Sequence, residues 1–434
     1  MCMIVVMIMI MLRQNSHLNL SIFYYYFPIF ECNIYLSICK NVRRCNFMKK
    51  KYQLYLLYSS IFLIFLGISL VIPVLPSIMN ELNISGAGVG YLTAAFAFTQ
   101  LIFSPFTGRA ADKFGRKIII VLGLFIFAFS ELLFGLGQSI EVLFVSRMLG
   151  GLAGACIMPA VTAFIVDLTT DKNRARSLGF MTAAINFGFI IGPGVGGVLA
   201  EVGTRLPFFV AAALGLLAAF GAIFMLSEPK KITEVAADKT EVTTSNFKRL
   251  FTPIFFIAFL VIFISSFGLA AFESFFSLYF DRKLGFTPTD IAIAITGGAM
   301  IGAFAQIFLF ERLTRSYGEL NIIRVSIIYT AVLVFAITFL ESYWSVMAVA
   351  FIIFIGFDLI RPSVTTFLSH IAGNNQGFAG GMNSFFTSLA NVVGPVIAGI
   401  LFDMNLDFPY YFSAAVLVIG FFITVFFWRD PRNA

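Results

Sequence analysis

Charged residues are scarce in this chain of 434 residues: Asp, Glu, Lys and Arg make up 12% of it, and hydrophobic residues make up 59%. A soluble globular chain averages about 25% charged and about 45–50% apolar residues. The shortage of charge therefore excludes a soluble protein. Uncharged runs such as residues 52–76 are long enough to cross a bilayer as helices. The sequence predicts an all-α integral membrane protein.

Histidine and cysteine are rarer still. The chain has two histidines and five cysteines, and four of those cysteines lie in residues 1–47, which leaves His370 and Cys156 in the remainder. Neither a disulfide framework, nor a metal site, nor a catalytic constellation can be built from so few groups. This argues against a membrane enzyme or a receptor, and we expect no metal and no cofactor.

Residues 1–47 differ from the rest of the chain in composition. Their apolar run, residues 1–12, is too short to span a membrane, and it lacks the basic flank and the cleavage site of a signal peptide. Met48 is followed by three lysines and then by the first good span. We therefore expect Met48 to be the natural start and residues 1–47 to be a non-native or disordered extension; a genuine mobile tail is the alternative.

Candidate spans number twelve and begin near residues 52, 88, 117, 141, 177, 206, 252, 289, 321, 343, 378 and 409. Lys and Arg gather in alternate loops and at both ends of this array, at 49–51, 109–117, 172–176, 230–249, 312–315 and 429–432. The positive-inside rule then places both termini in the cytoplasm. The formal net charge of +7 reflects this bias and requires no nucleic-acid partner.

An internal repeat divides the chain into two parallel halves. "PAVTAF" at 159–164 returns as "PSVTTF" at 362–367, and "GPGVGG" at 192–197 returns as "GPVIAG" at 394–399. Between the halves, residues 228–250 hold nine charged residues in 23 positions. We expect a six-helix half over 48–227, a cytoplasmic linker over 228–250 and a second six-helix half over 251–434, which is a common construction of transporters.

The string "GRAADKFGRK" (108–117) joins expected spans 2 and 3. Glycine allows a tight turn there, Asp112 can cap a helix or pair with a cation, and we expect the basic side chains to face lipid headgroups. A plain positive-inside loop is the simplest interpretation. The full pattern, however, resembles the loop between spans 2 and 3 of the major facilitator superfamily, which acts as a gate latch. This resemblance implies gating roles for Gly108, Asp112, Gly115 and Arg116.

The string "INFGFIIGPGVGG" (185–197) places three glycines at i, i+4 and i+8, so that one helix face is bare backbone. Such a face allows close helix packing, and the proline kinks the helix. Packing alone would explain much of the pattern. The string also resembles the span-5 motif of proton-coupled drug antiporters, which implies a conformational role for Gly188, Gly192, Pro193, Gly196 and Gly197.

Charged residues also lie inside apolar spans, among them Arg147, Glu273, Asp358 and Arg361. Each costs about 2.5–3.5 kcal/mol on insertion scales, so such residues normally face a cavity or a partner. Asp358 and Arg361 share a helix face and could partly neutralise each other, or form a purely structural ion pair. Glu273 has no cation within a helical turn, and we expect Phe272, Phe275 and Phe276 to surround it. Burial disfavours its charged form, which makes it a candidate proton carrier; the alternative is a solvated acid at the outer mouth.

From Met48 to the C-terminus, the chain resembles the NorA/Bmr-type multidrug:proton antiporters of Gram-positive bacteria. The strings that carry the match are "IFLIFLGISLVIPVLP", "GPGVGG", "IAIAITGG", "FIGFDLIRP" and "QGFAGGMNS". The resemblance implies proton coupling at Glu273 and Asp358, with protons as the coupling ion. It implies a substrate site made of these two acids and of Phe65, Ile68, Phe96, Gln100, Arg147, Ile185, Asn186, Phe189, Phe354, Arg361 and Asn391.

The expected function is therefore efflux of diverse hydrophobic, often cationic drugs (fluoroquinolones, dyes and quaternary ammonium compounds) by a monomer in the bacterial plasma membrane. Aromatic faces and carboxylates suit such substrates. A dedicated proton-coupled metabolite or sugar transporter of the same fold is the alternative, although a sugar porter would favour a more polar pore than this phenylalanine-rich chain with two tryptophans. The extension 1–47 is the one clear departure from the family.

Overall fold

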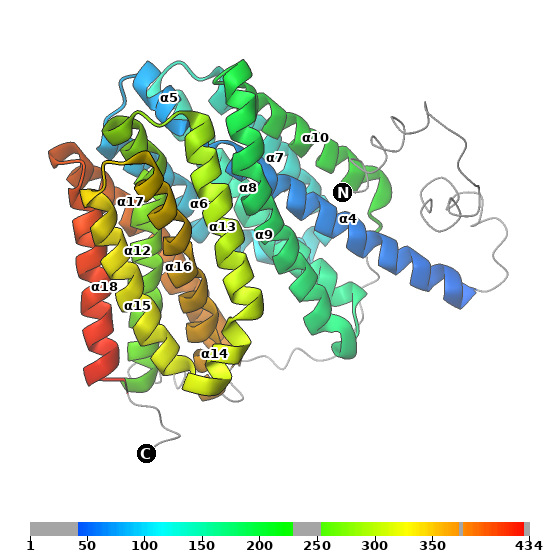
Figure 1. The fold of residues 1–434 in the computed structure, drawn as a ribbon. Coiled ribbons are helices and arrows are strands. Elements are labelled where there is room, and N and C mark those ends of the chain that lie inside the picture. The colour runs from blue at the N-terminus through cyan, green and yellow to red at the C-terminus, as the bar shows by residue number, and fades with distance from the viewer. Residues whose placement is uncertain (1–41, 229–252, 373–375, 429–434) are drawn as a thin grey trace, which may run out of the picture.

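The structure is a computed structural model that describes residues 42–228, 253–372 and 376–428, and these form a bundle of long helices (Figure 1). Residues 1–41 of the expected extension and 229–250 of the expected linker lie outside the described residues. The first helix begins at Val42, so residues 42–47 continue directly into the first span.

The helices of the first half are α4 (Val42–Leu70), η1 (Ile72–Val74), α5 (Leu75–Glu81), α6 (Gly86–Phe114), α7 (Arg116–Leu136), α8 (Ile140–Leu168), α9 (Asp171–Val202) and α10 (Leu206–Met225). The helices of the second half are α12 (Pro253–Leu284), α13 (Pro288–Phe308), α14 (Phe310–Tyr317), α15 (Glu319–Ala336), η2 (Ile337–Phe339), α16 (Tyr343–Ala372), α17 (Gln376–Met404) and α18 (Phe408–Phe426).

Among the described residues, 12 helices are long and apolar enough to cross a membrane. Each begins within three residues of a predicted start, so the predicted all-α fold with twelve spans is confirmed. The prolines of the internal repeat also occupy equivalent places. They lie inside α8 and α16, inside α9 and α17, and in the first turn of α10 and α18, at Pro159 and Pro362, Pro193 and Pro395, and Pro207 and Pro409.

The bundle has two ends. We call the end where α4 finishes and α6 begins the closed end, and the end where α6 is followed by α7 the basic end. At the closed end, near the top of Figure 1, α6 of the first half packs along α17 of the second, and α9 packs along α13. Toward the lower end of the view, α4 runs to the right, away from α12 and α18.

The contact between α6 and α17 is backbone to backbone. A Cβ atom at Gly90 would lie 2.2 Å from the carbonyl oxygen of Pro395. At the end of α17, the Asp403 carboxylate accepts hydrogen bonds from the backbone N–H groups of Gly86 (2.6 Å) and Ala87 (2.8 Å). The first N–H groups of a helix have no partner within it, and they carry the positive end of its dipole. A carboxylate from one half therefore caps a helix of the other.

Side chains add two further hydrogen bonds between the halves at the closed end. Thr289 Oγ1 donates to Glu201 at 2.7 Å, and Asn80 Nδ2 donates to Asp281 at 2.9 Å. Polar contacts and glycine-mediated packing thus hold the two halves together at this end.

Candidate functional site

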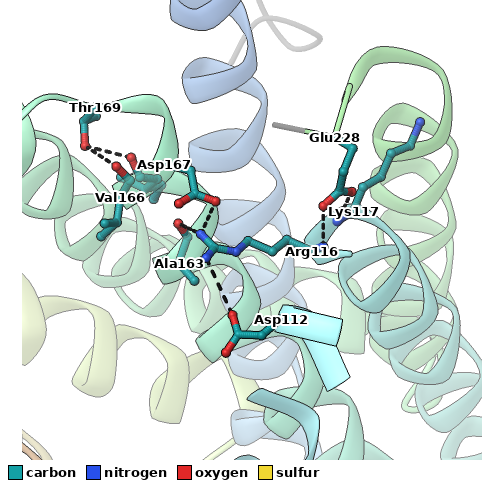
Figure 2. Close-up of polar contacts among 9 residues, drawn as sticks. Asp112, Arg116, Lys117, Ala163, Val166, Asp167, Thr169 and Glu228 are labelled. Carbon is teal, nitrogen blue, oxygen red and sulfur yellow. Dashed lines mark hydrogen bonds and ion pairs between the residues drawn. The ribbon is translucent and has the colours of Figure 1, made fainter. Parts of the chain in front are cut away.

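The loop between α6 and α7 lies at the basic end (Figure 2). The turn is the single residue Gly115, whose φ of +108° suits glycine, which lacks the Cβ atom that would clash there. Glu228, which follows α10, accepts hydrogen bonds from the backbone N–H groups of Arg116 (2.6 Å) and Lys117 (2.9 Å). Its carboxylate therefore caps the first turn of α7.

The Arg116 side chain points toward α8, as Figure 2 shows. It forms an ion pair with Asp167, donates a hydrogen bond to the carbonyl oxygen of Ala163 and lies 3.6 Å from Asp112. Lys117 Nζ donates to a backbone carbonyl of α10 at 2.7 Å. The prediction that these two basic side chains face lipid headgroups is wrong, because unpaired carbonyls and carboxylates at the helix ends lie within their reach. Asp112 pairs with a cation and does not provide the cap of α7.

The glycine face of α9 packs against α4. A Cβ atom at Gly188 would lie 2.8 Å from the α4 backbone, one at Gly192 would lie 1.8 Å from Ser69 Oγ, and one at Gly196 would lie 2.0 Å from a carbonyl oxygen of α4. Ser69 Oγ also lies 2.9 Å from the carbonyl oxygen of Gly188 and donates to it. The two helices therefore touch along three turns, with no room for a larger residue.

The other residues predicted to take part in gating lie in three different surroundings. Pro193 is buried inside α9. Gly197 faces the second half, where an added Cβ atom would lie 2.5 Å from the side chain of Ala292 on α13. Gly108 on α6 has only an ordinary contact, 3.8 Å, with Pro159 of α8. Among these three, Gly197 is the one at a contact between the halves.

The predicted substrate positions of the first half fall into two groups. In the first group, the rings of Phe65 on α4 and Phe189 on α9 lie 5.2 Å apart between centroids, with their planes tilted by 55°. Ile68 and Ile185 are half-buried on the same two helices, and Asn186 is exposed. This group offers an aromatic pair with one polar side chain nearby in sequence.

The second group lies on α6 and contacts α8. The Phe96 ring lies 3.1 Å from an ideal Cβ position at Gly150, and the Gln100 amide nitrogen lies 3.1 Å from that of Gly154. Both side chains are half-buried. Glycine on α8 thus makes the space in which these two side chains lie.

Glu273 lies on α12 with an exposed side chain, although its neighbours Phe272, Phe275 and Phe276 are buried in the core of the second half. The prediction that these rings surround the carboxylate is wrong. In a helix, positions −1 and +2 lie about 100° and about 160° around the axis from position 0, and position +3 lies about 60° from it. The three rings can therefore pack into the core while Glu273 lies at the edge of that face.

Asp358 lies half-buried on α16, against α13. A Cβ atom at Gly302 of α13 would lie 1.9 Å from its Oδ2 atom. Among the described residues, no ion pair within 4.0 Å joins Asp358 to Arg361, so the structural ion pair that the sequence left open as an alternative is not formed. Because α12 packs against α16, Glu273, Asp358 and Arg361 lie on neighbouring helices of the second half.

Phe354 and Asn391 differ in exposure. The Phe354 ring is 7% exposed, lies over Gly298 and meets the Phe272 ring edge to face at 6.3 Å. In this arrangement Phe354 belongs to the core of the second half, whereas Asn391 on α17 is exposed. Arg361 also lines a small pocket between α12, α16 and α17. The other polar residues of its lining are Ser265, Ser266, Thr365, Asn383 and Thr387.

Arg147 has a partner that the sequence analysis did not single out. Its guanidinium lies 3.9 Å from the carboxylate of Glu131 on α7, and the Glu131 side chain is 3% exposed. The signal was present, because Glu131 is the one charged residue in the apolar run 118–136. Among the described residues, no group of three or more His, Cys, Asp or Glu side chains could hold a metal ion.

The described residues form twelve candidate membrane spans in two halves, and the prolines of the two halves match. Ionisable groups lie in the middle of several of these helices. Together these features define the class of polytopic membrane transporters. The sequence profile of the Major Facilitator Superfamily matches residues 57–390 and 258–434, and the chain belongs to that family.

Two relatives are similar over nearly the whole chain. "Multidrug resistance protein 1" of Bacillus subtilis (strain 168) is 57% identical over 385 residues, which are 89% of this chain and 98% of the relative. "Quinolone resistance protein NorA" of Staphylococcus aureus is 46% identical over 376 residues, which are 86% of this chain and 96% of the relative. The resemblance to NorA/Bmr-type proteins is thereby confirmed.

Solved structures with low identity support the fold alone. A bacterial homologue of the human lysosomal transporter Spinster, in an inward-facing and occupied conformation, matches with a TM-score of 0.74 at 18% identity, over 88% of this chain and 98% of that one. The nucleoside transporter NupG matches with a TM-score of 0.73 at 16% identity, over 87% of this chain and 100% of that one.

Proposed function

We propose that this protein is a proton-coupled efflux pump for hydrophobic, often cationic drugs, including fluoroquinolones, dyes and quaternary ammonium compounds. The observation that carries the proposal is that Glu273, Asp358 and Arg361 lie inside α12 and α16, two apolar membrane-spanning helices that pack against each other. Ionisable groups at this depth are costly unless they face a cavity or a partner, and they commonly mark ion pathways. The relatives named as multidrug and quinolone resistance proteins support the substrate class.

The proposed orientation follows the distribution of positive charge. The basic end faces the cytoplasm, both termini lie there, and the closed end faces the outside of the bacterial plasma membrane. The protein acts as a monomer surrounded by lipid. It has no enzymatic activity and needs no cofactor, because a proton gradient drives it.

Transport proceeds by alternating access of the two halves. A drug enters from the basic end and contacts the aromatic side chains of Phe65, Phe96 and Phe189, while the carboxylates of Glu273 and Asp358 attract its positive charge. After the halves reorient, protons from the outside neutralise the acids and the cation leaves. Each returning proton supplies about 2.3 kcal/mol per 100 mV of membrane potential.

The 108–117 loop and the glycine face of α9 serve the reorientation. The 108–117 loop is held within the first half by Glu228 and Asp167, so it can move as one body with α7 and α8. The glycine face of α9 keeps α4 and α9 in close contact while the halves rock against each other.

The test is ethidium efflux from cells, with and without a protonophore, for the wild type, Glu273→Gln and Asp358→Asn. We expect the wild type to lose efflux with the protonophore, and each variant to lose most of its activity, because neither can exchange a proton at its altered site. Glu341→Gln serves as the matched control, since Glu341 is an exposed acid in the loop before α16.

Efflux that resists the protonophore, or full activity in both variants, contradicts proton coupling at these acids. A susceptibility panel with a fluoroquinolone, a dye and a quaternary ammonium compound addresses the substrate range. Protection against none of them favours the alternative, a dedicated metabolite or sugar transporter.

A further inference from the structure

A buried ion pair in the first half plays no part in the proton cycle described above. The Glu131 carboxylate of α7 lies 3.9 Å from the Arg147 guanidinium of α8, and their side chains are 3% and 17% exposed. Glu131 Oε2, Arg147 Nε and Arg147 Nη2 are buried and have no hydrogen-bond partner. The carboxylate therefore compensates the charge of the arginine without the short bidentate geometry of a strong ion pair.

An aromatic face also holds the Arg147 side chain. The guanidinium carbon lies 4.1 Å from the centroid of the Phe134 ring, which stacks in turn on Phe208 of α10. Phe134 follows Glu131 by one helical turn, so a single face of α7 offers both a negative charge and a ring that attracts cations.

The residues beside this pair fix its separation. Ser130 Oγ donates to the carbonyl oxygen of Ser146, and Ser146 Oγ donates to the carbonyl oxygen of Ser130, each at 2.8 Å. Both serines are buried. Because an unmade buried hydrogen bond is costly, these two bonds lock the register of α7 against α8 at the level of Glu131 and Arg147.

Arg147 borders the candidate substrate site. Gly150, one turn further along α8, faces the ring of Phe96, which is a predicted substrate position. A positive charge at this place repels a cationic substrate strongly in a medium of low dielectric constant, unless a negative charge lies behind it.

We propose that Glu131 is a positioning residue that determines specificity: it neutralises Arg147, holds it against Phe134 and so allows cationic drugs to occupy the site beside Phe96. This inference rests on the proposed function and concerns the choice among its substrates. Glu131 does not touch the drug and acts through Arg147. A zwitterionic drug depends less on Glu131, because its own carboxylate can pair with the arginine.

The test measures the Kd of ethidium, a cation, and of a zwitterionic fluoroquinolone for the purified full-length protein, by fluorescence anisotropy. For Glu131→Gln we expect the Kd of ethidium to rise roughly tenfold and that of the fluoroquinolone to change by less than about threefold. Glu131→Asp keeps the charge and should bind ethidium almost as the wild type does. Glu141→Gln is the matched control, since it removes an exposed acid at the start of α8.

A second arm removes both charges. In the Arg147→Gln background, adding Glu131→Gln should change the Kd of ethidium by less than about threefold, because no uncompensated cation remains. Equal losses for both ligands, or a tenfold loss that persists in this background, would overturn the inference. If Glu131→Gln alone fails to fold, Glu131→Asp and the paired variants decide, and weak ethidium binding by Glu131→Asp counts against the inference. Proton-independent efflux by the wild type would instead refute the proposed function and leave these binding results standing.

Discussion

Individual glycines decide how closely the helices approach each other. At Gly196 a single added carbon would lie 2.0 Å from a carbonyl oxygen, which is far inside a normal contact distance. At Gly179, near the other end of the same helix, nothing lies within 4 Å. The same substitution at these two positions should therefore have opposite consequences.

We expect Gly196→Ala to destabilise the protein by about 1–3 kcal/mol, because α9 must move away from α4 to admit the new atom. Gly179→Ala should leave stability unchanged or raise it by roughly 0.5–1 kcal/mol, because alanine favours the helix. The melting temperatures of the two purified variants in one detergent measure the difference. Equal melting temperatures would mean that α4 and α9 do not need the close contact seen here.

The residues of the site show where sequence reasoning succeeds. Glu273 and Asp358 were predicted because an acid inside an apolar span is a signal that needs no knowledge of the fold. Glu131 carries the same signal and was overlooked. The prediction for the surroundings of Glu273 is wrong, because residues that are close in sequence need not be in contact in space. The three phenylalanines are turned toward the core.

At the scale of the element, the start of α7 depends on a residue more than a hundred positions away. Glu228 caps the first turn of this helix, and Arg116 of that turn reaches α8. The sequence predicts a tight turn within 108–117 from its glycines alone, and the structure places that turn at Gly115. The sequence could not predict the partners of Arg116, because contacts between helices distant in the chain leave no local pattern.

We expect Glu228→Ala to destabilise the protein by about 1–2 kcal/mol, because two N–H groups at the start of α7 lose a charged acceptor. Glu311→Ala is the matched control. It removes an exposed pair with Arg315 within α14, which contributes about 0.3–0.5 kcal/mol. Chemical unfolding of both variants gives the comparison, and an effect of Glu228→Ala no larger than that of the control would exclude the capping role.

At the scale of the whole molecule, the two halves meet through Asp403 and the start of α6. The twelve spans and the repeat are predictable, because hydropathy and proline spacing can be read from the sequence. The contacts at the closed end are not predictable in this way, because they depend on how the two halves pack and not on any one segment.

We expect Asp403→Ala to shift the protein toward states opened at the closed end, because each charge-assisted hydrogen bond is worth about 1.5–3 kcal/mol. Spin labels at Leu136 and Phe339, exposed residues at this end of the two halves, report the separation in a chain whose five cysteines are replaced. Longer distances should become more populated. Glu81→Ala breaks a pair with Arg205 inside the first half and should leave the distances unchanged; the same result for Asp403→Ala would contradict this role.

The two hydrogen bonds between Asp403 and α6 join a side chain to backbone groups. The acceptor depends on the residue at position 403, whereas every residue except proline has the backbone N–H group that serves as the donor. A replacement at position 87 other than proline leaves its donor in place, whereas a Cβ atom at Gly86 would lie 2.7 Å from Phe402 and 2.9 Å from Asp403 itself. The hydrogen bonds are therefore lost by a change at Asp403, by a proline at either donor, or by a side chain at Gly86 or Gly90 that forces α6 away from α17. Variants that loosen the closed end should therefore be found both at Asp403 on α17 and at the glycines of α6 that face it.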